Sequence, residues 1–163
     1  MKTKLSLFVA VLAVALFVVG CASTLKEPPV PHAVEWNGHW YAFFPEGCHW
    51  DTAVKKCERL GGHLAYVESE AENNFILSLI AKSNRSKIYG VWLGGTDKKE
   101  EGDWLWLNGK PITNPFWDGD EPNNANNHQH YLMIGIDGKD LSKGKWYDVW
   151  EGTDQNGVIC EWE

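Results

Sequence analysis

Residues 50–80 read WDTAVKKCERLGGHLAYVESEAENNFILSLI, and this stretch holds the two clearest helical patterns of the chain. Over residues 50–60, apolar side chains recur at helical spacing, and the pair Gly61-Gly62 ends the pattern. The spacing predicts a helix whose buried face carries Trp50, Ala53, Val54, Cys57 and Leu60.

A second helix is predicted to begin at Ser69, because Ser69 and Glu72 have the spacing of a capping box. Its buried stripe is expected to consist of Ala71, Phe75, Ile76, Leu79 and Ile80. Beyond residue 83, short strand-like segments follow, at residues 89–93, 104–106, 131–136, 145–149 and 158–162. Two helices followed by short, antiparallel-looking strands indicate the α+β class.

Length and composition narrow the class further. A chain of 163 residues suits a single domain, and ten Trp with sixteen Gly indicate an aromatic core with many turns. With 15 basic and 22 acidic residues the net charge is −7, and no basic stripe is present. Nucleic acid is therefore excluded as a partner, since phosphate binding needs clustered Lys and Arg.

The first 20 residues have the pattern of an export signal. Lys2 and Lys4 precede an apolar run over residues 5–19, which is shorter than the roughly 20 residues of a membrane span. The ending Val18-Val19-Gly20-Cys21 resembles a bacterial lipoprotein box, which implies cleavage before Cys21 and lipidation of its thiol. An ordinary signal peptide with an incidental Cys, or an uncleaved anchor, is the alternative.

Residues 21–35 contain Pro28, Pro29 and Pro31 and predict an extended tether. The expected location is the cell envelope, with the protein lipid-anchored at an outer membrane or cell surface. The folded domain is then expected to span residues 36–163.

The loop over residues 118–130 is rich in hard oxygen donors. Calcium takes 6–8 such oxygens, whereas the alternative interpretation is a solvated turn. The donors are Asp118, Asp120, Glu121, Asn123, Asn124, Asn126, Asn127 and Gln129.

Several landmarks occur in one order along residues 36–163, which together resemble a C-type lectin-like domain. They are His39-Trp40-Tyr41, Trp50-Asp51-Thr52-Ala53 leading to Cys57, Gly61-Gly62-His63-Leu64-Ala65, Glu68-Ser69-Glu70-Ala71-Glu72-Asn73, Val91-Trp92-Leu93-Gly94-Gly95, Trp104-Leu105-Trp106, Phe116-Trp117-Asp118-Gly119-Asp120-Glu121-Pro122-Asn123-Asn124, Trp146-Tyr147-Asp148 and Val158-Ile159-Cys160-Glu161. The resemblance implies two helices, short antiparallel sheets and a long loop that binds ligand.

The resemblance also implies a disulfide between Cys57 and Cys160. Tyr131 and Glu151 stand where the family has a second bridge, so that bridge is not expected. Cys48 is left over, either as a buried thiol or as one half of an intermolecular disulfide.

Glu121-Pro122-Asn123 matches the sugar-binding signature of calcium-dependent family members. By this resemblance Glu121, Asn123, Gln129 and Asp148 are the metal ligands, and Pro122 follows a cis peptide bond. The expected sugar contacts are Glu121, Asn123, Asp148 and Tyr147, with a mannose- or glucose-type sugar as ligand.

Departures from the family pattern predict a weak calcium site. Gln129 replaces an acid and Tyr147 replaces an amide, which leaves two carboxylates among the ligands. An accessory calcium position keeps Asp97 and Glu101, but it has Asn124 and His130 where acids are usual. One site is expected rather than two.

Other side chains near the loop have competing interpretations. His128 and His130 could bind a transition metal, although solvated histidines are the favoured reading. Trp117 and Trp150 are the tryptophans considered for ligand contact, and core packing is expected for Trp92, Trp104, Trp106 and Trp146.

No hydrolase elbow, zinc-protease pair or phosphate-binding glycine loop is present, so an enzyme is not expected. Two hypotheses remain. The first is a membrane-tethered, calcium-dependent lectin whose partners are glycans or glycoconjugates. The second is a calcium-independent scaffold of the same fold that binds a protein or another non-sugar partner.

Overall fold

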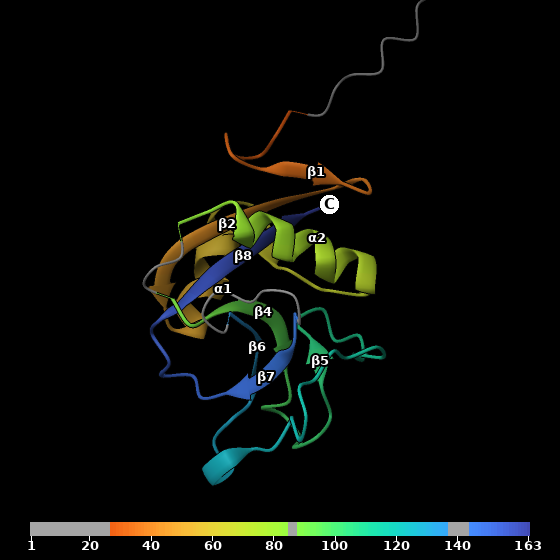
Figure 1. Ribbon diagram of the computed structural model, residues 1–163, viewed down its shortest axis with the longest axis vertical. Helices are drawn as coiled ribbons and strands as arrows, with labels where there is room; N and C mark the ends of the chain where they lie inside the picture. Colours follow the sequence, from red (N-terminus) through yellow and green to blue (C-terminus); the bar gives the residue numbers. More distant parts are fainter. Residues whose placement is uncertain (1–26, 85–87, 137–143) are drawn as a thin grey trace, which may run out of the picture.

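The architecture comes from a computed structural model that describes residues 27–84, 88–136 and 144–163. The lipidation signal predicted at Cys21 lies outside these residues. Within them, two helices accompany one sheet (Figure 1). The helices are α1 (Trp50–Arg59) and α2 (Glu70–Ala81). The strands are β1 (Val34–Trp36), β2 (His39–Cys48), β3 (His63–Leu64), β4 (Gly90–Thr96), β5 (Leu105–Trp106), β6 (Tyr131–Gly135), β7 (Trp146–Val149) and β8 (Asn156–Trp162).

The sheet has the strand order β1-β2-β8-β4-β6-β7, with β3 paired to β8 and β5 paired to β4. Its pairs are antiparallel except for β4 with β8, which run parallel. The α+β class is thus confirmed, although the strands form one continuous mixed sheet instead of several antiparallel ones. Strands β1, β2 and β3 lie outside the ranges predicted from the sequence.

Helices α1 and α2 cover opposite faces of β2 and β8 (Figure 1). Along β8 the side chains alternate between two apolar clusters: Ile159 packs in the cluster with α2, and Val158 and Cys160 pack in the cluster with α1. This alternation is the period of two that a strand imposes. The disulfide Cys57–Cys160 is confirmed, and it ties α1 to the middle of the sheet.

Helix α2 differs from its predicted pattern in two ways. Ala71 is exposed, whereas the polar residue Asn73 is buried. The side-chain oxygen of Asn73 accepts a hydrogen bond from the indole N–H of Trp146 (3.0 Å). The capping box is only half formed: Ser69 Oγ accepts the Glu72 N–H, but the Glu72 carboxylate accepts from Glu68 N. The reason is a competing partner, because the Tyr41 hydroxyl donates to Glu72 across the core (2.6 Å).

The ordered fold begins before residue 36. Val34–Trp36 form β1 against the start of β2, and Val30 and Ala33 pack on the α1 cluster. The C-terminal part of the predicted tether therefore belongs to the domain. Among the described residues, no helix combines the length and the apolar character that crossing a membrane requires.

The tryptophans expected to pack in the core are all buried, which confirms that prediction. They are Trp92, Trp104, Trp106 and Trp146. Cys48 is half-buried, and burial raises the pKa of its thiol. At the positions of the absent second bridge, the Tyr131 hydroxyl donates to Glu151 (3.2 Å), so a hydrogen bond joins the two segments there.

Candidate functional site

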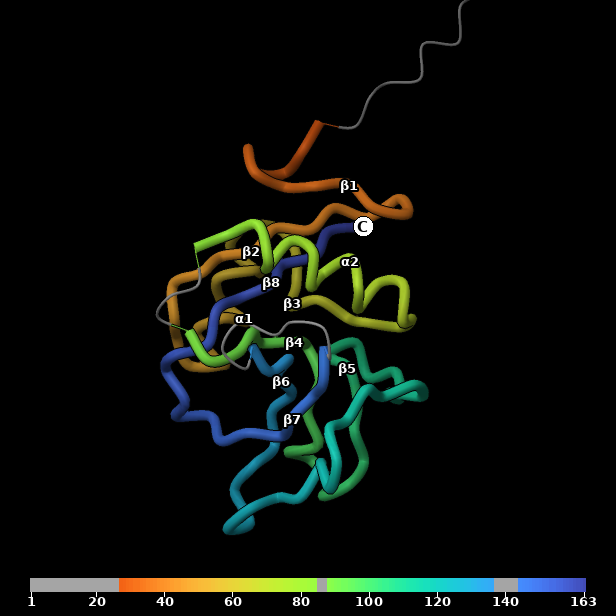
Figure 2. Tube along the Cα trace, in the orientation of Figure 1, coloured from red at the N-terminus to blue at the C-terminus, as the bar shows by residue number. Residues whose placement is uncertain are grey.

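The candidate site lies in the segment between β5 and β6, at the end of the molecule farthest from β1 (Figure 2). Residues 107–130 contain a single short element, the 3-10 turn η1 (Ala125–Asn127). Asn124, Asn126 and Asn127 have φ values of 42°, 61° and 58°. Asn tolerates this left-handed region better than most residues, which explains why the loop is rich in it.

The four predicted ligands come from two elements: Glu121, Asn123 and Gln129 belong to this loop, and Asp148 belongs to β7. Asn123 Nδ2 donates to Glu121 Oε1 (2.9 Å). The Asn123 and Gln129 side-chain oxygens both accept from the backbone N–H of Ala125, at 2.9 and 2.6 Å. The three loop side chains expected to hold calcium are therefore connected, and a cis peptide bond lies between Glu121 and Pro122.

Asp148 anchors the loop to the sheet. It is buried on β7, and its two carboxylate oxygens accept the backbone N–H groups of Asn123 (3.1 Å) and Asn124 (2.7 Å). The alternation of β7 turns Trp146 and Asp148 inward and Tyr147 to the other face. Asp148 thus holds the Asn123 side chain beside Glu121.

The Glu121 carboxyl is in an unusual electrostatic environment. Burial and the adjacent Asp148 carboxylate raise its pKa to about 7. Its Oε2 atom is buried and has no hydrogen-bond partner among the described residues. Two facing carboxylates and an unsatisfied buried oxygen are the arrangement that a bound cation neutralises, so these residues fit calcium.

Tyr147, predicted to contact sugar, lies at the edge of this group. Its hydroxyl donates to Asp118 Oδ2 (2.6 Å), and the Asp118 carbonyl accepts from Glu121 N (2.8 Å). Its ring lies against Gly135, where a Cβ would come within 2.5 Å of the ring. Asp118 therefore connects Tyr147 to the loop. Sequence reasoning counted Asp118 as an oxygen donor but gave it no such role.

The accessory position contains a histidine in contact with two carboxylates. His130 Nδ1 lies 3.1 Å from Asp97 Oδ1 and 3.4 Å from Glu101 Oε2, and the Asn124 amide donates to Glu101. The imidazole therefore stands among the acids that match the family's accessory calcium ligands. His128 lies elsewhere, beside Trp150, because β6 begins only at Tyr131 and the strand that would align the two histidines is absent.

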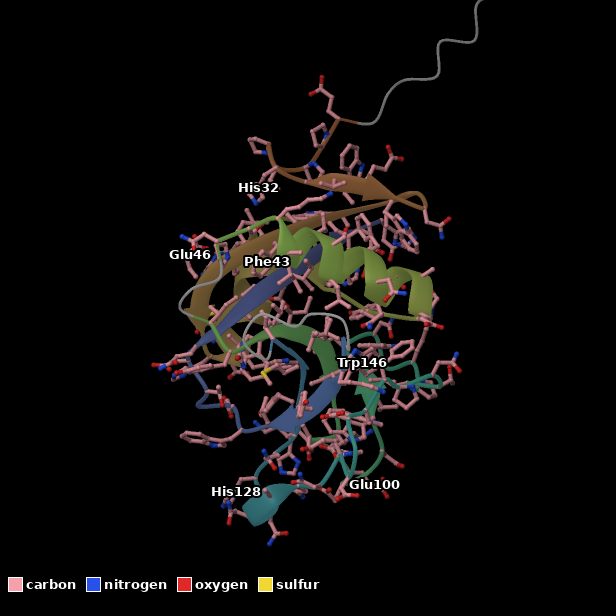
Figure 3. The ribbon with its side chains drawn as sticks, viewed as in Figure 1. His32, Phe43, Glu46, Glu100, His128 and Trp146 are labelled. Carbon is pink, nitrogen blue, oxygen red and sulfur yellow. A yellow bond between two sulfur atoms is a disulfide. The ribbon has the colours of Figure 1, made fainter. Side chains whose placement is uncertain are left out.

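The two tryptophans considered for ligand contact differ in exposure. Trp117 is half-buried and packs edge-on against the core residues Trp104 (4.8 Å) and Trp146 (6.0 Å). Trp150 is 59% exposed and lines a shallow cavity of about 250 Å³ with His128 and Gln129. Figure 3 shows His128 and Glu100 at this end of the molecule, opposite His32.

The fold and this loop match one known family. The model of the lectin C-type domain matches residues 46–162. A perlucin-like protein of Mytilus galloprovincialis is 34% identical over 158 residues, which cover 93% of this chain and 96% of that protein. An alpha-N-acetylgalactosamine-specific lectin of Patiria pectinifera is 30% identical over 131 residues, or 76% of each chain.

A solved structure shares the fold. The crystal structure of the C-type lectin CEL-I from Cucumaria echinata superposes with a TM-score of 0.74 at 24% identity, covering 82% of this chain and 96% of that chain. This likeness shows a shared fold. The chain belongs to the C-type lectin domain family. The relatives named here are eukaryotic, so they give no support to a bacterial lipoprotein.

Proposed function

We propose that the protein is a lectin that binds sugar through a calcium ion held by Glu121, Asn123, Gln129 and Asp148. The observation that carries this proposal is the Glu121–Asp148 pair, in which a raised pKa and an unsatisfied buried oxygen mark a place for positive charge. Names of relatives, such as the N-acetylgalactosamine-specific lectin of Patiria pectinifera, support a glycan as ligand.

A bound calcium ion would supply a Lewis-acidic centre to which neighbouring sugar hydroxyls can bind. The chain's own groups then fix the orientation of the sugar: Glu121 accepts a hydrogen bond from one sugar hydroxyl, and the Asn123 amide donates a hydrogen bond to another. Asp148 holds the Asn123 backbone in place. A mannose- or glucose-type sugar is the proposed ligand, because Glu-Pro-Asn accompanies that preference in the family that the sequence resembles.

Trp150 is proposed as a second contact to the same sugar. Its ring is exposed, and Gly152 lies so close to its face that a Cβ there would be 2.2 Å from the ring. One face of the indole is therefore supported and the ring is held in place. The opposite face is available to the apolar side of a pyranose next to Gln129, which lines the same cavity.

The test is retention on immobilised mannose with calcium and with chelator. Calcium-dependent retention should disappear in chelator and in Glu121→Gln, which removes a charged ligand without changing the shape of the side chain. Glu100→Gln is the matched control, since Glu100 is an exposed acid in the same region and is not part of the ligand group.

Retention that persists both in chelator and in Glu121→Gln would contradict the proposal. The absence of retention even in calcium would favour the second candidate, a calcium-independent scaffold for a non-sugar partner. One observation favours that candidate: both amide oxygens expected to bind calcium accept a hydrogen bond from Ala125 N.

Attachment to a membrane is a separate proposal that rests on the sequence alone. Lys2, Lys4, the apolar run at 5–19 and Cys21 support a lipid anchor at the cell envelope. Metabolic labelling with a radiolabelled fatty acid tests it: label should enter the protein and be absent from Cys21→Ser.

A further inference from the structure

A second group of metal-binding side chains lies at the opposite end of the sheet from the loop. His39 belongs to β2, His63 to β3, and Glu163 follows β8. Tyr41 and His63 are both paired with Glu161 of β8, so β8 runs between β2 and β3 here. One further step of the β2–β8 register brings His39 opposite Glu163. Paired residues share a face of the sheet, which places His39, His63 and Glu163 together.

The Glu163 carboxylate lies between the two imidazoles. Its Oε2 is 3.7 Å from Nε2 of His39, and its Oε1 is 3.7 Å from Nε2 of His63. Zinc binds His nitrogen and carboxylate oxygen at about 2.0–2.2 Å, so two ligand atoms on one tetrahedral ion are about 3.4 Å apart. Each contact is within a few tenths of an ångström of that separation, but the two rings face different oxygens of the carboxylate, so one shared ion requires the Glu163 side chain to turn. The Glu163 side chain is 75% exposed and can adjust to an ion.

The other nitrogen of each ring fixes which nitrogen is free. His39 Nδ1 lies 2.7 Å from Glu161 Oε1, and His63 Nδ1 lies 2.9 Å from the Leu64 carbonyl oxygen. A carboxylate and a carbonyl can only accept, so Nδ1 carries the proton in both rings. In the neutral form of each ring, Nε2 then has its lone pair on the side of Glu163. Metal-binding histidines have this arrangement, with an oxygen acceptor holding the far N–H.

The surroundings hold both rings and leave the site open. The His63 ring stacks on Tyr66, with ring centres 4.2 Å apart. Glu161 is itself fixed: it is buried and accepts the Tyr66 N–H (2.9 Å) and the Tyr41 hydroxyl (3.2 Å). His39, Glu161 and Glu163 line a cavity of about 340 Å³, and His63 and Glu163 line a second one of about 330 Å³, so Glu163 is accessible from the side of each ring.

We propose that His39, His63 and Glu163 bind a divalent transition metal, with zinc as the best fit. Two imidazole nitrogens and one carboxylate are a zinc set, whereas calcium prefers oxygen alone. Glu161 and the Leu64 carbonyl act as outer acceptors, and water completes the coordination. Such an ion would join β2, β3 and β8 at the end of the sheet away from the loop at residues 107–130. Its binding would not depend on calcium bound in that loop.

The test is calorimetric titration of zinc chloride into the metal-stripped full chain, in a buffer that contains calcium. One zinc ion per chain is expected. His39→Ala and His63→Ala should each weaken binding by about tenfold or more. Glu163→Gln should also weaken it, and because that side chain is exposed, the variant tests the site without disturbing the core.

Two further variants make the result specific. His49→Ala removes an exposed histidine that makes no side-chain cap at α1, and its zinc affinity should be unchanged. His130→Ala removes the histidine that lies with Asp97 and Glu101 in the loop. Zinc binding that is lost in His130→Ala but kept in His39→Ala and His63→Ala would overturn the proposal, as would the absence of any zinc binding.

Discussion

The sheet with its helices and the loop at residues 107–130 are held together by different forces. Around the sheet, Trp92, Trp146, Ile159 and their neighbours are almost fully buried, and a disulfide crosses the core. The loop instead relies on polar contacts, such as the two backbone N–H groups bound by Asp148. The sheet is therefore held by apolar burial and a cross-link, whereas the loop brings together charges that a cation would neutralise.

Loss of the disulfide in the sheet should change stability more than any other substitution considered below. Replacing Cys57 and Cys160 together by Ala removes a cross-link between residues 103 apart in the sequence. In the chain-entropy model such a cross-link contributes up to about 4–5 kcal/mol to the free energy of unfolding. Urea denaturation should show a loss of that order, and Cys48→Ala, which breaks no disulfide, should change stability by less than about 1 kcal/mol.

The same variants test whether the two regions are independent. If the double mutant is still folded, its calcium affinity should equal that of the parent chain, because no loop contact involves the disulfide. A calcium affinity that falls together with the stability would contradict the comparison.

The second effect is on the loop alone. With a dissociation constant of about 0.5 mM, 5 mM calcium should stabilise the fold by about 1.4 kcal/mol, which is a few degrees in melting temperature. The measurement is a thermal melt with calcium and with chelator. In Glu121→Gln the calcium-dependent rise should vanish, while the melt in chelator stays at or above that of the parent, since a repulsion with Asp148 is removed. An equal rise in both proteins would place calcium elsewhere.

The two regions also differ in how far the sequence predicts them. Helix α1 was predictable to its last turn, because its apolar spacing and the Gly61-Gly62 stop are local signals. Strand β2 was not, although it is the longest strand, because its apolar run has no alternation over residues 40–44. The prediction of a complete capping box was wrong because Tyr41, which is distant in sequence, competes for the Glu72 carboxylate.

For the loop, the four predicted calcium ligands were inferred from the resemblance to the C-type lectin family. The structure adds contacts between residues that are far apart in the sequence. The pairing of His130 with Asp97 joins residues 33 apart, and the link between Tyr147 and Asp118 joins residues 29 apart. Contacts of this kind depend on the register of β4, β6 and β7. The histidine group at the far end of the sheet was equally hidden, because His39, His63 and Glu163 meet only through the pairing of β8.

A third effect is the pH dependence of calcium binding. Burial and Asp148 raise the pKa of Glu121 from its ordinary 4.5 to about 7. Calcium requires the carboxylate, so protons compete, and affinity should fall by about tenfold between pH 8 and pH 6. Without calcium the sign is opposite: the folded state holds this proton more tightly, so stability from this group falls as pH rises from about 4.5 to about 7.

Calorimetric titration of calcium at several pH values measures this dependence. In Glu121→Gln the proton competition should be absent along with most of the affinity, and Glu100→Gln should keep the parent's profile. A calcium affinity that is the same at pH 6 and pH 8 would mean that Glu121 is already ionised before calcium binds.

The smallest predicted change in affinity distinguishes sugar binding from calcium binding. Trp150→Ala removes an exposed aromatic ring. Of the four predicted calcium ligands, Gln129 alone lines the same cavity as this ring. Sugar affinity should fall about fivefold, which is on the order of 1 kcal/mol for one aromatic contact, while calcium affinity stays constant. Trp150→Phe should keep part of the sugar affinity, since a smaller ring still offers one face. Unchanged sugar binding in Trp150→Ala would remove this residue from the site, and a parallel loss of calcium would mean that the indole supports the loop itself.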